Sequence, residues 1–221
     1  MTAAVAIVAA WIVGAYLAGS IPFGWLIGKA RGVDIRELGS KNIGATNCGR
    51  VCGWPYGIVA FVLDVAKGFG PGAAAVAWLP AMIEFSDENR RWLAIVLVAA
   101  QPIIGHLFPV WLGFKGGKAV ATSLGVLLSL PMLRWAALAA LGVWLIVTGL
   151  TKYVSVGSTV AALAFMGIYL WLERDKAWGE YLAVTVFVFH VVGLVIIRHR
   201  SNYARLLKGT ENKLWGGTKR S

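Results

Sequence analysis

Two short stretches of this sequence combine glycine with cationic and hydroxyl side chains, and each lies between long apolar runs. The first, residues 39–47, reads GSKNIGATN and is followed closely by Arg50. The second, residues 114–122, reads FKGGKAVAT. Glycine lets the backbone approach a ligand closely, and Lys, Arg, Ser, Thr and Asn donate hydrogen bonds to anions. The two stretches therefore predict a site for phosphate groups beside a membrane.

The candidate ligands in the first stretch are neutral donors and one planar guanidinium, namely Ser40, Asn42, Thr46, Asn47 and Arg50. In the second stretch two lysines flank a glycine pair, giving Lys115, Gly116, Gly117 and Lys118. The nucleotide-binding pattern G-x4-G-K-[ST] is absent, so a nucleotide P-loop is not supported. The alternatives are a solvated Gly- and Asn-rich turn for the first stretch and topology-setting lysines for the second.

Four further candidates lie at the ends of apolar runs: His106, Ser155, His199 and Asn202. His106 is suited either to act on a substrate or to brace the lysine loop. Ser155 is suited either to bind an anion at the start of a helix or to serve as its N-cap. The segment around His199 is alternatively a basic tail that fixes topology.

The composition excludes an ordinary soluble domain. Hydrophobic residues make up 58% of the 221 residues, and the mean hydropathy is +0.71. The predicted class is an all-α polytopic membrane protein with one domain, residues 1–221. The net charge of +11 lies mainly in short loops and the C-terminal tail, which favours anionic lipid or a phosphorylated substrate over nucleic acid.

Clear candidates for membrane spans are residues 3–28, 55–79, 92–112, 154–172 and 181–197. Residues 120–150 form one long helix or two helices broken at Pro131. Two helices give seven spans, with the N-terminus outside and the C-terminus cytoplasmic. That topology puts fifteen basic residues inside and five outside, in agreement with the positive-inside rule. The fourth helix then rises only about 16 Å, so we expect it to be buried among the others.

The predicted topology puts all four polar clusters on the cytoplasmic face, whereas the external loops carry ordinary charges. Within a span, Asp64 and Lys67 are expected to form a structural ion pair, because intramembrane charges are costly unless paired. Cys48 and Cys52 have no second Cys pair to complete a metal site, and the cytoplasmic acids are too sparse for a Mg²⁺ cage. No metal and no cofactor are expected.

Several motifs in this order and spacing resemble those of the bacterial acyl-phosphate-dependent glycerol-3-phosphate acyltransferases, the PlsY family. The motifs are GSIPFG at 19–24, residues 39–47, DVAKG at 64–68, Gly105-His106 with FKGGK at 114–118, and HRSN at 199–202. The resemblance covers nearly the whole chain. It departs from the family at Lys41 and Ala119, where the family commonly has glycine.

The resemblance implies seven transmembrane helices in a bacterial inner membrane and transfer of a fatty acyl group from acyl phosphate to the 1-hydroxyl of sn-glycerol 3-phosphate. The products would be lysophosphatidic acid, in the first acylation step of phospholipid synthesis, and phosphate. The implied partners are the two substrates, membrane lipid and the enzyme that supplies acyl phosphate.

The resemblance also assigns residue roles. The acyl-phosphate head group would be lined by Ser40, Asn42, Thr46, Lys115, Ser155 and Asn202, and the glycerol phosphate would be held by Arg50, Lys115 and His199. The catalytic set is Ser40, Arg50, Lys115, His199 and Asn202. Asn42, Thr46, Asn47, Ser155, His106, Lys118, Gly116 and Gly117 complete the binding site.

No Ser or Cys has the neighbouring base that a covalent nucleophile needs, so we expect direct attack by the substrate hydroxyl, assisted by a substrate phosphate oxygen. The alternative function is a transporter for a phosphorylated metabolite. Transporters usually bind near the midplane and often contain inverted repeats. Here the donors gather on one face and no repeat is visible, which favours the acyltransferase.

Overall fold

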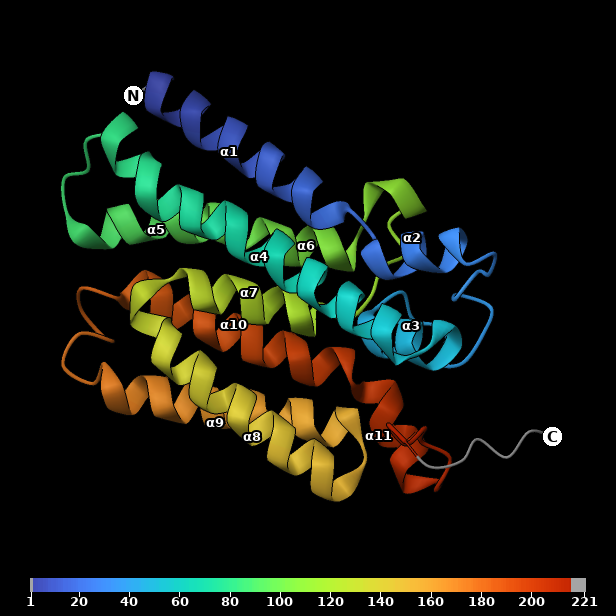
Figure 1. The fold of residues 1–221 in the computed structure, drawn as a ribbon. Helices are drawn as coiled ribbons and strands as arrows, with labels where there is room; N and C mark the ends of the chain where they lie inside the picture. The colour runs from blue at the N-terminus through green and yellow to red at the C-terminus, as the bar shows by residue number, and fades with distance from the viewer. Residues whose placement is uncertain (1, 216–221) are drawn as a thin grey trace.

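The computed structural model describes residues 2–215, and all regular elements in that range are helical. The elements run side by side as an elongated bundle (Figure 1). In chain order they are α1 (Thr2–Ser20), α2 (Phe23–Ala30), α3 (Ala45–Cys52), α4 (Trp54–Met82), α5 (Glu88–Ala99), α6 (Gln101–Leu107), η1 (Val110–Leu112), α7 (Val120–Ser129), η2 (Pro131–Leu133), α8 (Arg134–Thr151), α9 (Val154–Leu172), α10 (Leu182–Arg198) and α11 (Arg200–Leu207).

Five helical segments in the described range are long and apolar enough to cross a membrane, and the bent pair α10 and α11 brings the number to six. The prediction of a helical, multi-pass protein is confirmed. The remaining predicted span, the fourth along the chain, corresponds to α7, which is apolar but has only 10 residues. A helix of that length rises about 15 Å, half the thickness of a hydrocarbon core. The total of seven spans and the orientation of the termini remain predictions.

Proline decides where two of the predicted spans are interrupted. α7 ends at Ser129, Pro131 opens the 3-10 turn η2, and α8 begins at Arg134, so the predicted break at Pro131 is confirmed. The predicted span 92–112 is divided instead into α5, α6 and η1, and Pro102 lies at the start of α6. Proline lacks the N–H that would continue the helical hydrogen bonds, and it is tolerated in a first turn.

α7 lies inside the bundle, packed along α4 (Figure 1). Glycine makes this approach possible. A Cβ on Gly68 of α4 would clash with the carbonyl of Thr122, and a Cβ on Gly125 of α7 would clash with the carbonyl of Val65. A Cβ on Gly72 of α4 would clash with the side-chain hydroxyl of Ser129, so small residues allow the two helices to pack closely along their length.

The predicted ion pair within α4 is present and buried. Lys67 Nζ lies 2.8 Å from Asp64 Oδ1, and the two side chains are 3% and 2% exposed. Lys67 also donates a hydrogen bond of 2.6 Å to the carbonyl of Ile21, in the break between α1 and α2. The pair therefore anchors that break to the longest helix of the bundle.

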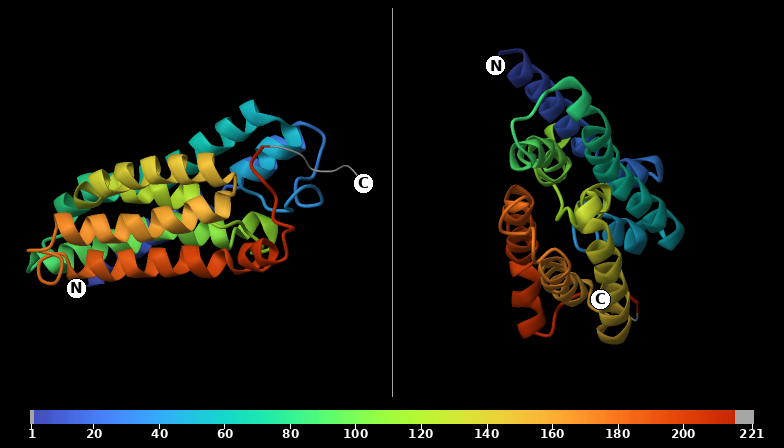
Figure 2. Two further views of the ribbon diagram at one scale, coloured as in Figure 1. Left: turned by 90° about the horizontal axis from the view of Figure 1, so that it is seen from below. Right: turned by 90° about the vertical axis from the view of Figure 1, so that its left-hand side faces the viewer.

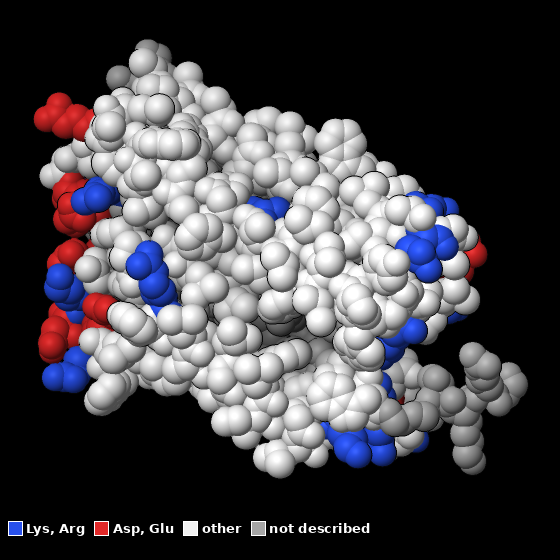
Figure 3. All heavy atoms as spheres, viewed as in Figure 1, with Lys and Arg blue, Asp and Glu red and all other residues white. Residues whose placement is uncertain are grey.

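The two ends of the molecule differ in charge. Figure 3 shows acidic and basic side chains mixed at one end, mainly basic side chains at the other, and a surface between them that is almost entirely uncharged and is hollowed near its middle. The basic end contains α2, α3, α11 and the irregular segments near them, as the left view in Figure 2 shows. The polar clusters expected to share one face therefore do share one end of the bundle.

Candidate functional site

A cavity of about 300 Å³ opens at the basic end and continues into the bundle. We call it the polar cavity. Ten of the thirteen predicted site residues line it, although their roles in binding and catalysis remain predictions. They are Ser40, Asn42, Thr46, Asn47, Arg50, His106, Lys118, Ser155, His199 and Asn202. Lys115, Gly116 and Gly117 are not in its lining.

The first glycine-rich stretch is held in shape by Asn47, which is buried near the start of α3. Its Nδ2 donates to the carbonyls of Ile35 at 2.7 Å, Asn42 at 2.9 Å and Leu38 at 3.2 Å, and its Oδ1 accepts from the Ser40 N–H at 2.7 Å. These bonds occupy both polar atoms of the amide. Asn47 therefore organises the loop that presents Ser40 and Asn42, a role that the sequence reasoning did not assign to it.

The second glycine-rich stretch divides its two lysines between different sites. Lys118 enters the polar cavity, where its Nζ donates to Oδ1 of Asn202. Lys115 lies in a neighbouring basic groove, which is lined by Arg36, Lys41, Ile43, Leu107, Phe108, Phe114, Lys115, Gly116 and Arg198. Both lysines were predicted for one binding site, and the structure places them in the linings of two different hollows.

The glycine pair between the lysines packs against the end of α6 instead of lining the cavity. The Gly117 N–H donates to the carbonyl of His106 at 3.1 Å. A Cβ on Gly117 would clash with the His106 ring, and one on Gly116 would clash with the carbonyls of His106 and Leu107. Only glycine allows the loop to lie this close to α6, and the contact separates the directions of the two lysines.

Burial lowers the pKa of Lys118 to about 8. The negative charge of Glu211 opposes this change, whereas the positive charges of Arg205, Arg50 and Arg198 add to it. A buried cation surrounded by other cations favours an anionic ligand, because a phosphate would compensate the lost solvation and the repulsion together.

His106 is braced inside the cavity wall. Its Nδ1 lies 3.1 Å from Oγ1 of Thr122 and 3.7 Å from Oδ1 of Asp64, and its side chain is 4% exposed. Asp64 therefore connects His106 to Lys67, so the structural ion pair of α4 also supports the wall of the polar cavity. Both roles considered for His106 are compatible with this geometry, since it braces the lysine loop and reaches the cavity.

His199 lies between α10 and α11 and is almost completely buried. Its Nδ1 is 2.7 Å from the carbonyl oxygen of Val195. Because a carbonyl only accepts hydrogen bonds, Nδ1 carries the proton, and in a neutral ring Nε2 is then left as an acceptor.

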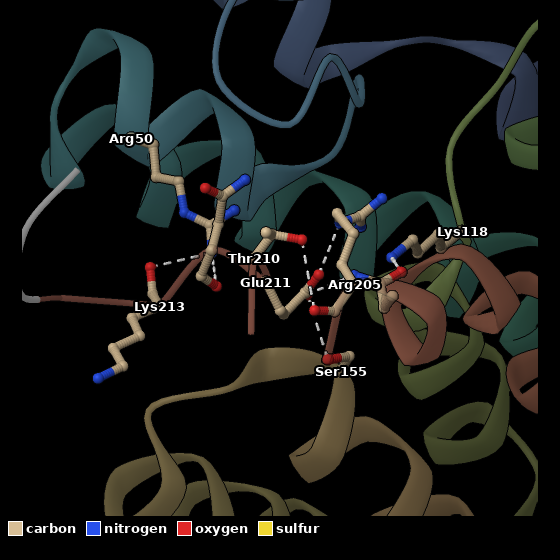
Figure 4. Close-up of polar contacts among 9 residues, drawn as sticks. Arg50, Lys118, Ser155, Arg205, Thr210, Glu211 and Lys213 are labelled. Atoms are coloured by element: carbon tan, nitrogen blue, oxygen red, sulfur yellow. Dashed lines mark hydrogen bonds and ion pairs between the residues drawn. The ribbon is translucent and has the colours of Figure 1, made fainter. Parts of the chain in front are cut away.

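The segment after α11 forms part of the site, which the sequence reasoning missed. Glu211 Oε1 accepts from Asn202 Nδ2 at 2.5 Å and from Ser155 Oγ at 3.2 Å, and its Oε2 accepts from Arg205 Nε at 2.8 Å. Figure 4 shows this carboxylate between Arg205 and Ser155, with Lys118 nearby. Ser155 is not the N-cap of α9, a position that Tyr153 takes.

Arg50 of α3 ties the same segment to the other wall of the cavity (Figure 4). Its guanidinium donates to the carbonyl of Asn212 at 3.2 Å and to that of Lys213 at 3.3 Å. Further along, the Leu214 N–H donates to the carbonyl of Lys152 at 2.7 Å. The sequence contains one sign that this segment belongs to the site: Glu211 is the only acidic residue after Glu180, and it lies in a basic tail.

Beyond its polar end, the cavity becomes apolar. Its inner lining comes from four helices and includes Leu124 and Leu127 of α7, Ala137, Ala140, Leu141 and Trp144 of α8, Ala161, Ala162 and Phe165 of α9, and Val191 and Val192 of α10. A ligand with a charged head and a hydrocarbon tail matches such a lining at both ends. Within residues 2–215, no group of three or more His, Cys, Asp or Glu residues is placed to hold a metal ion.

The fold and the site define a multi-pass helical membrane protein with a cationic cavity that leads into an apolar channel. The model of the family described as glycerol-3-phosphate acyltransferase matches residues 9–209. The chain belongs to this family of integral membrane acyltransferases. The glycerol-3-phosphate acyltransferase of Anaeromyxobacter sp. (strain Fw109-5) is 42% identical over 201 residues, which are 90% of this chain and 92% of the relative. That of Desulfotalea psychrophila (strain LSv54 / DSM 12343) is 45% identical over 201 residues, covering 90% and 94%.

Two crystal structures of an integral membrane glycerol 3-phosphate acyltransferase, PlsY (YgiH), share the fold. The glycerol 3-phosphate form has a TM-score of 0.81 and 36% identity, and the alignment covers 95% of this chain and 96% of the other. The lysophosphatidic acid form has a TM-score of 0.78 and 35% identity, with coverage of 93% and 94%. The predicted membership of the PlsY family is confirmed.

Proposed function

We propose that this protein transfers a fatty acyl group from acyl phosphate to the 1-hydroxyl of sn-glycerol 3-phosphate, giving lysophosphatidic acid and phosphate. The observation that carries the proposal is the continuity of the polar cavity with its apolar channel. Acyl phosphate and lysophosphatidic acid each have a phosphate and a hydrocarbon chain, so either one matches both parts of this lining. The relatives' names specify the acceptor, glycerol 3-phosphate, and the chemistry of the cavity supports the donor.

The proposed setting is a bacterial inner membrane with seven spans, of which α7 is the short one. The N-terminus would face the outside, and the polar cavity would face the cytoplasm, where both substrates arise. The charge difference between the two ends of the bundle supports this orientation (Figure 3). The enzyme that supplies acyl phosphate would approach the same basic end.

Within the polar cavity, we assign the donor phosphate to Ser40, Asn42, Thr46, Ser155 and Asn202. Arg50 would hold the phosphate of the acceptor, and Nε2 of His199 would accept a hydrogen bond from one of the acceptor's hydroxyl groups. Lys118, which lies against Asn202, takes the place that the sequence reasoning gave to Lys115 between the two phosphates. A cation there would lower the repulsion between two anionic substrates.

Catalysis then requires mainly positioning and charge stabilisation, because phosphate is a good leaving group from a mixed anhydride. The acceptor oxygen would attack the acyl carbonyl carbon, the bond from that carbon to the phosphate oxygen would break, and phosphate would leave with the electron pair. The hydroxyl proton would pass to a phosphate oxygen. Cys48 and Cys52 are not in the cavity lining, and the Ser155 hydroxyl donates to a carboxylate that Arg205 already neutralises, so none of these three residues is set up as a covalent nucleophile.

The test is a donor comparison with the purified protein. Labelled glycerol 3-phosphate is incubated with palmitoyl phosphate or with palmitoyl coenzyme A, and labelled lysophosphatidic acid is measured. The proposal expects product from the acyl phosphate and none above background from the thioester. A second arm uses radiolabelled acyl phosphate without acceptor. Label that stays covalently bound to the protein after denaturation would contradict direct transfer.

A further inference from the structure

The basic groove is separate from the polar cavity and lies beyond the glycine pair that divides Lys115 from Lys118. Its cations come from three parts of the chain: Arg36 and Lys41 from the segment between α2 and α3, Lys115 from the segment before α7, and Arg198 from the end of α10. Within residues 2–215, no Asp or Glu is part of the groove lining. The groove is therefore a concave surface lined by cations and by no carboxylate.

Three of the four cations are available to a ligand. Arg36 is committed to Asp34, with two charge-assisted hydrogen bonds of 3.0 and 2.7 Å that hold the pKa of that carboxyl well below its usual range. Lys41 and Lys115 are exposed, and neither forms an ion pair with any residue in the described range. Arg198 donates from one terminal nitrogen to the carbonyl of Gly117 at 2.6 Å, which fixes its guanidinium beside the groove.

The rest of the lining is apolar, and it continues into an exposed aromatic surface. Phe108 and Phe114 line the groove and are 47% and 59% exposed. Trp111, between them in sequence, is 61% exposed. Exposed aromatic side chains at the charged end of a membrane bundle are typical of the level of the lipid head groups. A ligand here would place its charge among the lysines and its apolar part against the phenylalanines.

We propose that the basic groove binds the phosphodiester head group of an anionic membrane phospholipid. A free phosphate ion would satisfy the cations but would leave the aromatic wall without a partner, so the lining favours the lipid source. The site is distinct from the proposed acyl-transfer site and does not depend on it. Lys41 and Lys115 provide the charge, Arg198 provides a fixed fork, and Phe108 and Phe114 contact the apolar part of the lipid.

Lys41 offers a way to test the site without disturbing the fold. Its φ of 57° lies in the left-handed region, which glycine adopts freely and lysine does not. Replacing it by glycine keeps the local backbone and removes the charge. Lys152 has the same backbone conformation, with φ of 64°, and lies outside the groove, so Lys152→Gly is a matched control.

The experiment measures lipid binding to the purified protein in neutral detergent micelles by native mass spectrometry, with phosphatidylglycerol compared with phosphatidylcholine. The wild type is expected to prefer phosphatidylglycerol by at least about tenfold. The double variant Lys41→Gly/Lys115→Gln should lose about 10- to 30-fold in affinity for phosphatidylglycerol, on the basis of about a factor of five for each lysine near anionic lipid. Its affinity for phosphatidylcholine should not change.

The control is Lys152→Gly/Lys208→Gln, which removes the same charges elsewhere and should bind like the wild type. An equal loss in the control would show attraction by net charge alone and would overturn the proposal. So would an unchanged affinity in the groove variant. A further arm adds inorganic phosphate as a competitor, to separate a lipid site from a site for free phosphate. If inorganic phosphate displaced phosphatidylglycerol from the groove at equal concentration, the proposal of a lipid site would also be overturned.

Discussion

The polar cavity and the basic groove share one wall but balance their charges differently. In the cavity, Glu211 accepts hydrogen bonds from Ser155, Asn202 and Arg205, so part of the positive charge is compensated by the protein itself. The groove has no carboxylate in its lining, and its lysines are exposed. The difference fits the two proposals, because the protein's own carboxylate organises the cavity, whereas the charge of the groove would be balanced by an external anion.

The wall itself consists of neighbouring residues that face opposite ways. Lys118 and His199 line the cavity, whereas Lys115 and Arg198 line the groove. Arg198 holds the carbonyl of Gly117. Occupancy of the groove is therefore expected to steady the loop that carries Lys118.

The largest expected effect on stability comes from removing the carboxylate of the cavity. Glu211→Ala should lower the free energy of unfolding by about 3 kcal/mol, because it leaves the Arg205 charge and two polar donors without their partner. Denaturant unfolding in micelles measures this. Glu180→Ala is the control: Glu180 pairs with Lys176 at 3.4 Å on the surface, where the loss should be below about 0.5 kcal/mol. Equal losses in the two variants would contradict the assignment of Glu211 to the site.

The pH dependence of kcat/KM for glycerol 3-phosphate should distinguish the cavity lysine from the groove lysine. Lys118 is cationic below its pKa of about 8 and neutral above it, so kcat/KM should fall with rising pH above 8, by about tenfold per unit. The substrate phosphate is already a dianion in this range, with a second pKa of about 6, and does not cause the fall.

Lys118→Arg keeps the charge at high pH and should move the fall to higher pH. Lys115→Arg should leave the profile where it is. If the fall in kcat/KM moved to higher pH in Lys115→Arg and not in Lys118→Arg, the assignment of Lys118 to the cavity would be contradicted.

The cavity has an apolar channel, which the groove lacks, and a large side chain placed in that channel should shorten it. Ala140→Phe should lower kcat/KM for an 18-carbon donor about tenfold relative to a 12-carbon donor, because the added ring fills the inner channel. Ala139→Phe adds the same ring on the exposed side of α8 and should not change the preference for chain length. Competition between the two donors, with products separated by mass, gives the ratio directly.

The smallest effect concerns the backbone at the groove. Lys41→Gly should raise the free energy of unfolding by about 1 kcal/mol, since it relieves a left-handed lysine. Lys208→Gly, at a φ of −87°, should lower the free energy of unfolding, because glycine there relieves no strain and loses more conformational entropy on folding. Thermal unfolding of the three proteins without added lipid makes the comparison, and a loss of stability in Lys41→Gly would contradict it.

Local features of the sequence were enough to predict the long helices and most of the polar residues that line the cavity. Apolar runs predict the long helices, and Pro131 predicts the break between α7 and α8. Both signals are local, because each is contained within about twenty residues. The polar residues near Asn42 and His199 were found because glycine-rich and basic stretches stand out between apolar runs. Lys41 and Ala119, the two departures from the family's glycines, both adopt positive φ, which explains in physical terms why glycine is usual there.

What the sequence could not predict depends on contacts between distant residues. The separate directions of Lys115 and Lys118 follow from the packing of Gly117 on His106, which spacing within the loop does not reveal. The role of Glu211 depends on its contact with Ser155, 56 residues away. Asn47 looked like a free donor, but its amide is used by the loop that it organises.

The division between the polar cavity and the basic groove is tested most directly by one pair of variants. Initial rates of lysophosphatidic acid formation from acyl phosphate and labelled glycerol 3-phosphate are compared for Lys118→Met and Lys115→Met. We predict a loss of about 100-fold for Lys118→Met, because a charge that stabilises the reacting phosphates is removed, and less than about threefold for Lys115→Met. Equal losses, or a larger loss for Lys115→Met, would contradict the account.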